Sequence, residues 1–446
     1  MKPTRSLLFW TFWWVAGGVA ADEGASLALS GKPMTLRQVQ EIARQNHPRI
    51  AQAQMQAQAS QEAIVQAKSA FLPNIMQETV AAISNSTKQT PARLTAGWGF
   101  APPPIASRVA TGLTLKQLVT DFGRTSALVE GSELKAKASE SEVQATDAQV
   151  LLLATNAYYQ VFQSQEVLRI AEETLKARQL DLTRVKAMMK SGLTSSLDVS
   201  FAEVNLSDAQ LLQIKAQNDL NSARAILSTA MGYREPQDIL AKEEPMPPPV
   251  DNLDKAITEA LYQRPDLQSV RLKLQAAEKF VEAEKAAALP NVQLVGNINY
   301  MPWINYKTGN VSGAYPQFNV IGGLVIDIPV FTGFELSARR DKAQSEARAL
   351  SHGLTDAENE ILRDVRVAWM ASKTALERLA PAHQQLLKAQ EAFRLAQSRY
   401  NLKLASIIEL TQAQLNLTRA EIGELEARVD LQMRRAELDY QMGKLR

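Results

Sequence analysis

The side chains that most often carry catalysis are scarce in this sequence. His47, His352 and His383 are its only histidines, and no two of them are spaced to share a metal ion. Cysteine is absent, which excludes disulfides, thiolate metal ligands, a thiol nucleophile and lipid attachment to a cysteine. No nucleophile or phosphate-loop motif occurs. The sequence therefore predicts no enzyme, no metal site and no cofactor.

The N-terminal residues have the composition of a secretion signal. Lys2 and Arg5 precede an apolar run of about 14 residues, and the run ends in Val19, Ala20 and Ala21, which suit a signal peptidase. A membrane-spanning helix needs about 20 apolar residues. We therefore expect residues 1–21 to be a cleaved signal peptide, with a retained anchor as the alternative.

The charge balance bears on possible partners. Without Lys2 and Arg5 the 49 basic residues fall to 47, which equals the number of acidic residues, so the mature chain carries no formal net charge. Nucleic-acid binding needs a basic patch or stripe, and the sequence does not provide one. We expect no nucleic-acid partner.

An internal repeat divides the sequence into two similar halves, whose helices and strands must position any functional site. Residues 43–50 resemble residues 260–267, and residues 72–75 resemble 289–292, in both cases 217 positions further on. Residues 204–207 resemble 415–418, which lie 211 positions further on. Five prolines from Pro236 to Pro249 indicate an extended linker between the copies. The predicted domains are a first repeat (22–231), a Pro-rich linker (232–252) and a second repeat (253–446).

Each half is expected to begin with a helix and two strands. The helices cover about residues 36–70 and 253–288 and end before Pro73 and Pro290, because proline disfavours helix in the residue before it. The strands that follow alternate apolar with polar or small residues, which gives each strand one apolar face. A second strand is expected at 109–120 and at 320–330. In the second half the apolar positions are Val292, Leu294, Ile298 and Tyr300, then Val320, Leu324, Ile326 and Ile328.

A long helix follows the second strand of each half. Residues 125–190 contain no proline and a single glycine, and as a helix they span roughly 100 Å. Apolar and small residues recur in steps of four and three, the pattern of a coiled-coil seam. Return helices at about 193–231 and 404–442 complete a helical hairpin in each half. The seam positions are Val150, Ala154, Ala157, Val161, Ser164, Leu168, Ala171, Leu175, Leu182 and Val185, then Ile361, Val365, Ala368, Ser372, Ala375, Leu379, Ala382, Leu386, Ala389, Phe393 and Ala396.

Four strands per chain cannot close a membrane barrel, because the smallest such barrels have about eight strands and an open edge in lipid leaves backbone groups unpaired. No apolar stretch of 18 residues follows the signal, so we expect no transmembrane helix. The predicted fold is mainly α, with long antiparallel coiled-coil hairpins and a membrane β-barrel part, which a homotrimer closes with twelve strands in outer-membrane lipid. Aromatic residues flank the strands, either as an interfacial girdle or packed in loops: Trp98, Tyr300, Trp303, Tyr306 and Phe318.

The order of the motifs resembles the TolC family of outer-membrane factors. The resemblance covers residues 35–443 and includes the repeated Pro-x-Ile/Leu helix, the Leu-Pro-Asn start of the first strand, Asp121–Arg124 after the second strand and Lys190–Val199 at the hairpin tip. It implies a trimer with a β-barrel in the cell outer membrane and a helical tunnel in the periplasm. It also implies two partners, a periplasmic adaptor (membrane fusion) protein and an inner-membrane pump, in a tripartite efflux pump or a type I secretion system.

The resemblance assigns adaptor contacts to the hairpin tips. The first tip has Gly192, Leu193, Thr194 and Ser195, although Gly192 is equally suited to a structural turn. At the second tip Leu404 matches the pattern. Lys403, however, stands where the family usually has glycine, which weakens the assignment of a second contact.

The resemblance also implies a periplasmic aperture lined by Asp198 and Glu409, each of which forms a ring of three acids in a trimer. Such rings favour cations. The alternative is that both acids only stabilise the N-terminus of a return helix. Tyr400 matches a tyrosine of the closing network, and core packing is its alternative role. Two further gate positions of the family are occupied differently here, by Ala405 and Gln412.

The alternative function is a soluble periplasmic coiled-coil adaptor or scaffold, since long hairpins also occur in pump adaptors. Those usually have one hairpin flanked by compact β domains, whereas two hairpins are expected here. The sequence specifies neither the transported solute nor the class of inner-membrane pump.

Overall fold

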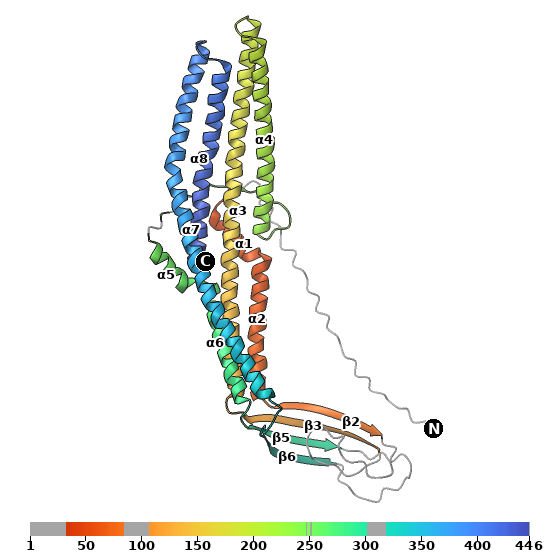
Figure 1. The fold of residues 1–446 in the computed structure, drawn as a ribbon. Helices are drawn as coiled ribbons and strands as arrows, with labels where there is room; N and C mark the ends of the chain where they lie inside the picture. Colours follow the sequence, from red (N-terminus) through yellow and green to blue (C-terminus); the bar gives the residue numbers. More distant parts are fainter. Residues whose placement is uncertain (1–32, 84–106, 247, 250–251, 301–317, 446) are drawn as a thin grey trace, which may run out of the picture.

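The computed structural model describes residues 33–83, 107–246, 248–249, 252–300 and 318–445. The expected signal peptide and the aromatic residues Trp98, Trp303 and Tyr306 lie outside these ranges. The described chain is elongated, with two long helical hairpins at one end and a sheet that leaves the helices at the other end (Figure 1).

The two halves contain the same elements in the same order. The first half has α1 (Leu36–Asn46), α2 (Pro48–Lys68), β2 (Asn74–Ile83), β3 (Ser107–Thr120), α3 (Arg124–Lys190) and α4 (Ser196–Ala230). The second has α5 (Leu253–Gln263), α6 (Pro265–Ala286), β5 (Asn291–Tyr300), β6 (Phe318–Asp327), α7 (Glu335–Asn401) and α8 (Ile407–Gln441). A short 3₁₀ turn (Ser69–Phe71) follows α2, and two-residue strands β1 (Pro33–Met34) and β4 (Leu240–Ala241) complete the order.

The prediction of a single first helix in each half was wrong. Each breaks at the residue before a proline: His47 has ψ 124° and Arg264 has ψ 120°, both extended. Proline clashes with a helical residue at the preceding position, and its own fixed φ suits the first turn of a new helix. The His47 side chain caps the new helix by accepting a hydrogen bond from the Arg49 amide.

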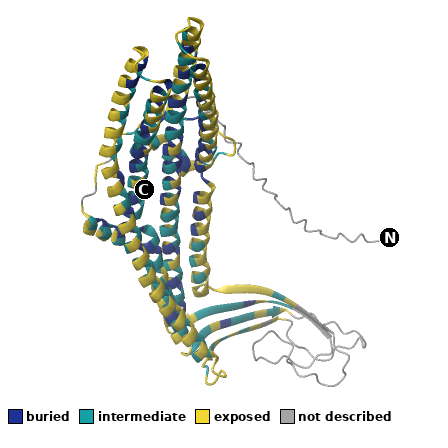
Figure 2. Cartoon of the chain, turned by 45° about the horizontal axis from the view of Figure 1, so that its top comes forward, coloured by how far each residue is buried: buried dark blue, intermediate teal, exposed yellow. Residues whose placement is uncertain are grey.

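The four hairpin helices match the predicted long coiled coil. In α3 the seam residues Val150, Ala154 and Val161 are at most 1% exposed, and in α7 Val365 is fully buried. In Figure 2 buried positions appear as dark blue segments that recur along the long helices. Alanine is frequent among them, which allows neighbouring helices to pack closely.

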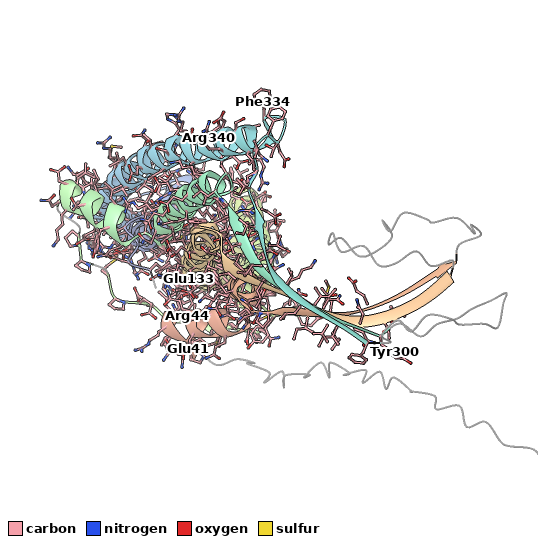
Figure 3. The ribbon with its side chains drawn as sticks, turned by 90° about the horizontal axis from the view of Figure 1, so that it is seen from below. Glu41, Arg44, Glu133, Tyr300, Phe334 and Arg340 are labelled. Atoms are coloured by element: carbon pink, nitrogen blue, oxygen red, sulfur yellow. The ribbon has the colours of Figure 1, made fainter. Side chains whose placement is uncertain are left out.

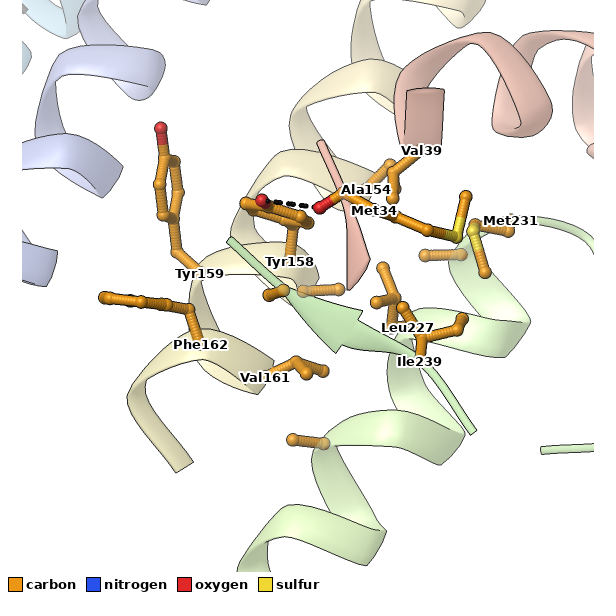
Figure 4. Packing of buried hydrophobic residues seen from close by; sticks show 14 of the residues in the cluster. Met34, Val39, Ala154, Tyr158, Tyr159, Val161, Phe162, Leu227, Met231 and Ile239 are labelled. Carbon is orange, nitrogen blue, oxygen red and sulfur yellow. Dashed lines mark hydrogen bonds between the residues drawn. The ribbon is translucent and has the colours of Figure 1, made fainter. Parts of the chain in front are cut away.

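The largest core cluster lies where the hairpins meet the lower helices (Figure 4). Tyr158 of α3 is fully buried there, and its hydroxyl lies 3.0 Å from the Met34 carbonyl and 2.8 Å from the Lys242 carbonyl. The Lys242 amide donates to the same hydroxyl over 2.9 Å. Burial raises the pKa of Tyr158, so the hydroxyl keeps its proton and remains a donor. This tyrosine fixes the parallel pair β1–β4 against α3.

The four long strands form one sheet in the order β2-β3-β5-β6, with antiparallel neighbours. The register puts alternate residues of all four strands on a common face. One face is apolar and largely exposed: it carries Ile75, Leu113, Leu115, Leu294, Ile298, Val320, Leu324 and Ile326. The other face carries mainly polar residues, among them Asn74, Glu78, Thr114, Lys116, Asn291, Gln293, Asn297 and Asp327.

Among the helices that the structure describes, none covers the apolar face of the sheet. Val320 remains 72% exposed and Leu324 65% exposed in the single chain. In the view from below, the strands extend sideways from the helices and Tyr300 lies at their far end (Figure 3). The Tyr300 and Phe318 rings lie 6.3 Å apart, centroid to centroid, at that end.

Two glycines at the ends of the return helices allow close backbone contacts. Gly232 has φ +86°, and a Cβ there would lie 2.6 Å from the Asn46 carbonyl oxygen. Gly443, its counterpart in the second half, has φ +72° and touches the backbone of Arg264. Each return helix therefore ends against the break between the two lower helices of its own half.

We expect Gly232→Ala to destabilise the protein by more than the about 1–3 kcal/mol typical of backbone strain alone, because the added methyl group must also displace Asn46. The matched control is Gly192→Ala, where φ is +70° but no atom lies within 4 Å. Thermal unfolding in detergent measures both losses. Equal losses would show that the contact with Asn46 does not matter.

Candidate aperture and docking tips

The two hairpin tips lie at the same end of the molecule, opposite the sheet (Figure 1). The first tip connects α3 to α4 and the second connects α7 to α8. All eight residues that the sequence analysis assigned to the aperture or to adaptor contacts lie in or beside these two tips. The fold therefore gathers them into one region.

Asp198 in the first tip is bound within its own turn. Gly192 takes the left-handed conformation that ends α3. Ser195 caps α4: its hydroxyl accepts a hydrogen bond from the Asp198 amide over 3.3 Å, and its own amide donates to the Asp198 carboxylate over 3.4 Å. The Thr194 hydroxyl also donates to that carboxylate. This reciprocal capping stabilises the start of α4.

Glu409 occupies the equivalent place in the second tip but has a different partner. The Ser406 hydroxyl caps α8 by accepting from the Glu409 amide over 3.2 Å. The Glu409 carboxylate lies 3.3 Å from the guanidinium of Arg399, at the end of α7. Arg399 also donates to the Leu404 carbonyl over 3.4 Å. Lys403 adopts φ +61° in this turn, where the first tip has glycine.

The sequence analysis missed Arg399. Residues 399 and 409 are equidistant from residue 404, the centre of the turn, so a hairpin brings them together across it. A search for opposite charges placed symmetrically about each predicted turn would have found this pair. The pair gives Glu409 a compensating positive charge within its own chain, whereas Asp198 forms no ion pair with the described residues.

Tyr400 lies in the core between the two hairpins. It is 9% exposed and packs in a cluster with Val185, Val199, Ile407 and Leu410, which come from three other helices. Its buried hydroxyl makes no hydrogen bond with the described residues. Burial raises its pKa, and the negative charge of Asp198 adds to the effect. The packing of Tyr400 fits its alternative role in the core, and a role in a closing network stays a prediction.

A buried charge lies within the first hairpin, below the tips. Arg178 of α3 is only 5% exposed, and burial lowers its pKa although Asp181 and Asp208 oppose the change. Asp181 also accepts a hydrogen bond from Gln414 of α8 over 2.7 Å. The sequence analysis did not single out Arg178, although it stands in the seam of α3, three residues after Leu175 and four before Leu182. A charged residue at a seam position is the signal that could have found it.

Large apolar side chains are exposed at both tips. Leu193 is 53% exposed and Leu404 is 67% exposed. Three further residues, missed by the sequence analysis, are about as exposed: Leu197, Leu402 and Ile408. Exposed apolar residues gathered at the end of a hairpin are typical of a protein-docking surface.

In the described part of the chain, no group of three or more histidine, cysteine, aspartate or glutamate residues could hold a metal ion. None of its helices has the length and apolar composition needed to cross a membrane.

The chain is similar to known channel proteins over most of its length. Outer membrane protein TolC of Vibrio cholerae serotype O1 is 24% identical over 416 residues, which cover 90% of each chain. Outer membrane protein TolC of Escherichia coli K12 is 23% identical over 437 residues, which cover 94% of this chain and 85% of the relative. Among solved structures, the transmembrane channel protein CusC has the same fold, with a TM-score of 0.77 at 18% identity over 92% of each chain.

The family model described as "Outer membrane efflux protein" matches the chain twice, at residues 39–233 and 256–444. Together these matches cover far more than half of the sequence. The chain belongs to the outer membrane efflux protein family.

Proposed function

We propose that three copies of this chain form a continuous conduit, with a twelve-stranded barrel in the outer membrane and a helical tunnel in the periplasm. As a member of its family the chain is an outer-membrane efflux channel subunit. The finer proposal is that it works with a periplasmic adaptor and an inner-membrane pump, as part of a tripartite efflux pump or a type I secretion system. We further propose that the mature chain begins after residue 21 and consists of repeats 22–231 and 253–446, joined by the linker 232–252.

The main observation in support of the proposal is that the sheet has one apolar face and one mainly polar face. Its apolar face is exposed, which suits contact with lipid, and its opposite face is rich in asparagine, which suits a water-filled lumen. A soluble scaffold would have to keep this uncovered apolar face in water, at an unfavourable free energy of about 25 cal/mol per Å². The sheet therefore favours the channel over the periplasmic scaffold.

Closure supports a trimer. The sheet ends at β2 on one side and β6 on the other, and both edges need hydrogen-bond partners in lipid. Three sheets in a ring give twelve strands, enough for an aqueous lumen.

The apolar tips support an adaptor as partner, since Leu193 and Leu404 are exposed at the end farthest from the sheet. A catalytic function has no supporting observation, and the family is one of transport proteins.

The direct test of the proposal is the mass and conductance of the purified protein. After extraction from outer membranes in mild detergent, light scattering should give a protein mass of three times the 49.1 kDa of the full sequence, less the signal peptides. Planar bilayers should then show ion conductance. A protein that is monomeric and soluble without detergent would contradict the channel and favour the scaffold.

Neighbouring residues on β5 test which face of the sheet meets lipid. Leu294→Arg places a charge on the apolar face, where it costs about 2–4 kcal/mol at the bilayer midplane. Gln293→Arg places the same charge on the polar face of the same strand and should be tolerated. Heat-resistant trimer in outer-membrane fractions is the measurement. Equal yields from the two variants would contradict the assignment of the faces.

The pair Arg399–Glu409 predicts that Glu409 adds little to the cation preference of the proposed aperture. Arg399→Gln leaves the three Glu409 carboxylates uncompensated and should shift the reversal potential in a KCl gradient further towards cation preference. Glu409→Gln should shift it the other way, and the double variant should return towards wild type. Unfolding free energies should change by only about 0.2–1 kcal/mol, because both side chains are about half exposed. Identical reversal potentials in all four proteins would show that Glu409 does not line the conducting path.

A further inference from the structure

The two breaks between the lower helices have the same backbone contacts but carry different charges. His47 separates α1 from α2, and Arg264, its counterpart 217 positions further on, separates α5 from α6. A Cβ on Gly232 would touch the His47 backbone, and a Cβ on Gly443, 211 positions further on, would touch the Arg264 backbone. Figure 1 shows α1 and α2 meeting near the lower end of α4. The break in each half is thus the place where a return helix ends.

The positive charge at the second break is compensated. Arg264 is 8% exposed, and its guanidinium donates two hydrogen bonds to the Asp266 carboxylate, over 2.6 and 3.1 Å. A third goes to the Gln441 side chain over 2.7 Å. Burial raises the pKa of Asp266, but the hydrogen bonds and charge of Arg264 outweigh this effect and lower it. Since arginine also keeps its charge, this pair persists in mild acid.

The first break lacks both partners of such a charge. The counterpart of Asp266 is Arg49, and the counterpart of Gln441 is Ala230. The first turn of α2 contains no acidic residue, whereas the first turn of α6 contains Asp266. A positive charge on His47 would therefore meet a second cation, an alanine and the positive end of a helix dipole.

Neutral His47 has a structural role that its protonated form cannot fill. The side chain is buried, and its Nδ1 accepts a hydrogen bond from the Arg49 amide over 3.2 Å, which caps α2. Accepting this bond requires a lone pair on Nδ1, and in the imidazolium both ring nitrogens carry a hydrogen. Burial lowers the pKa of His47, and the positive charge of Arg49 lowers it further.

Charged groups on the neighbouring elements do not compensate a proton on His47. Asp147 of α3 is paired with Arg44 of α1 over 2.8 Å. The segment after α4 contributes Arg234 and Glu235, which are exposed and opposite in sign. Within the part of the chain that the structure describes, His47 forms no ion pair, and Arg49 is the charged group that acts on it.

We infer that His47 is an acid-sensitive switch: its protonation removes the cap of α2 and loosens the contact among α1, α2 and the end of α4, while the equivalent contact of the second half is maintained. All of these groups belong to one chain, so the inference does not depend on the proposed trimer. Its consequence is that acid changes the support of the first hairpin and leaves that of the second unchanged.

The direction of the pH dependence follows from the proton balance. The folded state holds His47 neutral at pH values where the unfolded chain already binds a proton, because the folded pKa lies below the ordinary value of 6.5. The stabilisation that the neutral ring provides is therefore complete above pH 6.5. It is lost as the pH falls from there through the folded pKa.

The test is hydrogen–deuterium exchange of the purified protein in detergent at about pH 7.5 and about pH 5, on either side of the ordinary histidine pKa. Mass spectrometry reads peptides from residues 36–60 and from their counterparts 253–277, after correction for the intrinsic effect of pH on exchange. We expect the first set to exchange about fivefold faster in acid, the factor that corresponds to loss of a typical helix cap. The second set should show no comparable change.

Three variants assign the response to the ring. His47→Asn keeps a capping side chain that takes no proton, so the acid response of residues 36–60 should disappear. His383→Asn changes an exposed histidine of α7 and should leave the response intact. Arg49→Asp supplies the carboxylate that the second half has at this place and should also abolish the response, because a protonated ring then has an acidic partner.

An acid response of equal size in the wild type and in His47→Asn would overturn the switch. A response that Arg49→Asp leaves unchanged would overturn the role assigned to the missing carboxylate. Neither result bears on the channel proposal, which is tested separately by the mass and conductance of the purified protein.

Discussion

Backbone hydrogen bonding in hydrocarbon is the constraint on which this structure depends. An N–H or C=O group at the edge of a sheet has no water to bind inside a bilayer, so each edge strand needs another strand. The described part of this chain supplies one four-stranded sheet, with β2 and β6 at its edges. The apolar face and the open edges belong to the same sheet, and the two together favour the proposed ring of copies over a monomer. In that proposed ring the helices continue, below the membrane, the circle that the strands define.

Much of the fold could be predicted because it depends on periodicity. A step of four and three residues predicts a buried stripe wherever it continues, and Val150 and Val365 lie on such stripes. The break between α1 and α2 was harder to predict, because α2 is nearly as apolar on one side as on the other. Only Pro48 marks the start of α2. The strands β1 and β4 could not be predicted, because two residues carry no period and their pairing depends on Tyr158, far away in the sequence.

The two hairpin tips have equivalent sequence positions but different side-chain contacts. Asp198 and Glu409 occupy matching positions, and each stands in the first turn of a return helix. One is held by Thr194 and Ser195 of its own turn, and the other by Arg399 from the preceding helix. Position in a motif thus predicted where the two acids lie. Their hydrogen-bond and ion-pair partners determine how far each negative charge is compensated. Those neighbours become visible only when the two arms of each hairpin are placed side by side.

The composition of the main core cluster has a consequence for biogenesis. It combines Met34 and Val39 near the start of the described chain with Leu425 and Val429 near its end. A core made from both ends has a high contact order, which slows folding. Because an exported chain crosses the inner membrane N-terminus first, β1 emerges long before the residues that complete its surroundings. Until α8 has emerged, the apolar residues of this cluster lack part of their packing, and such transiently exposed apolar surface favours aggregation.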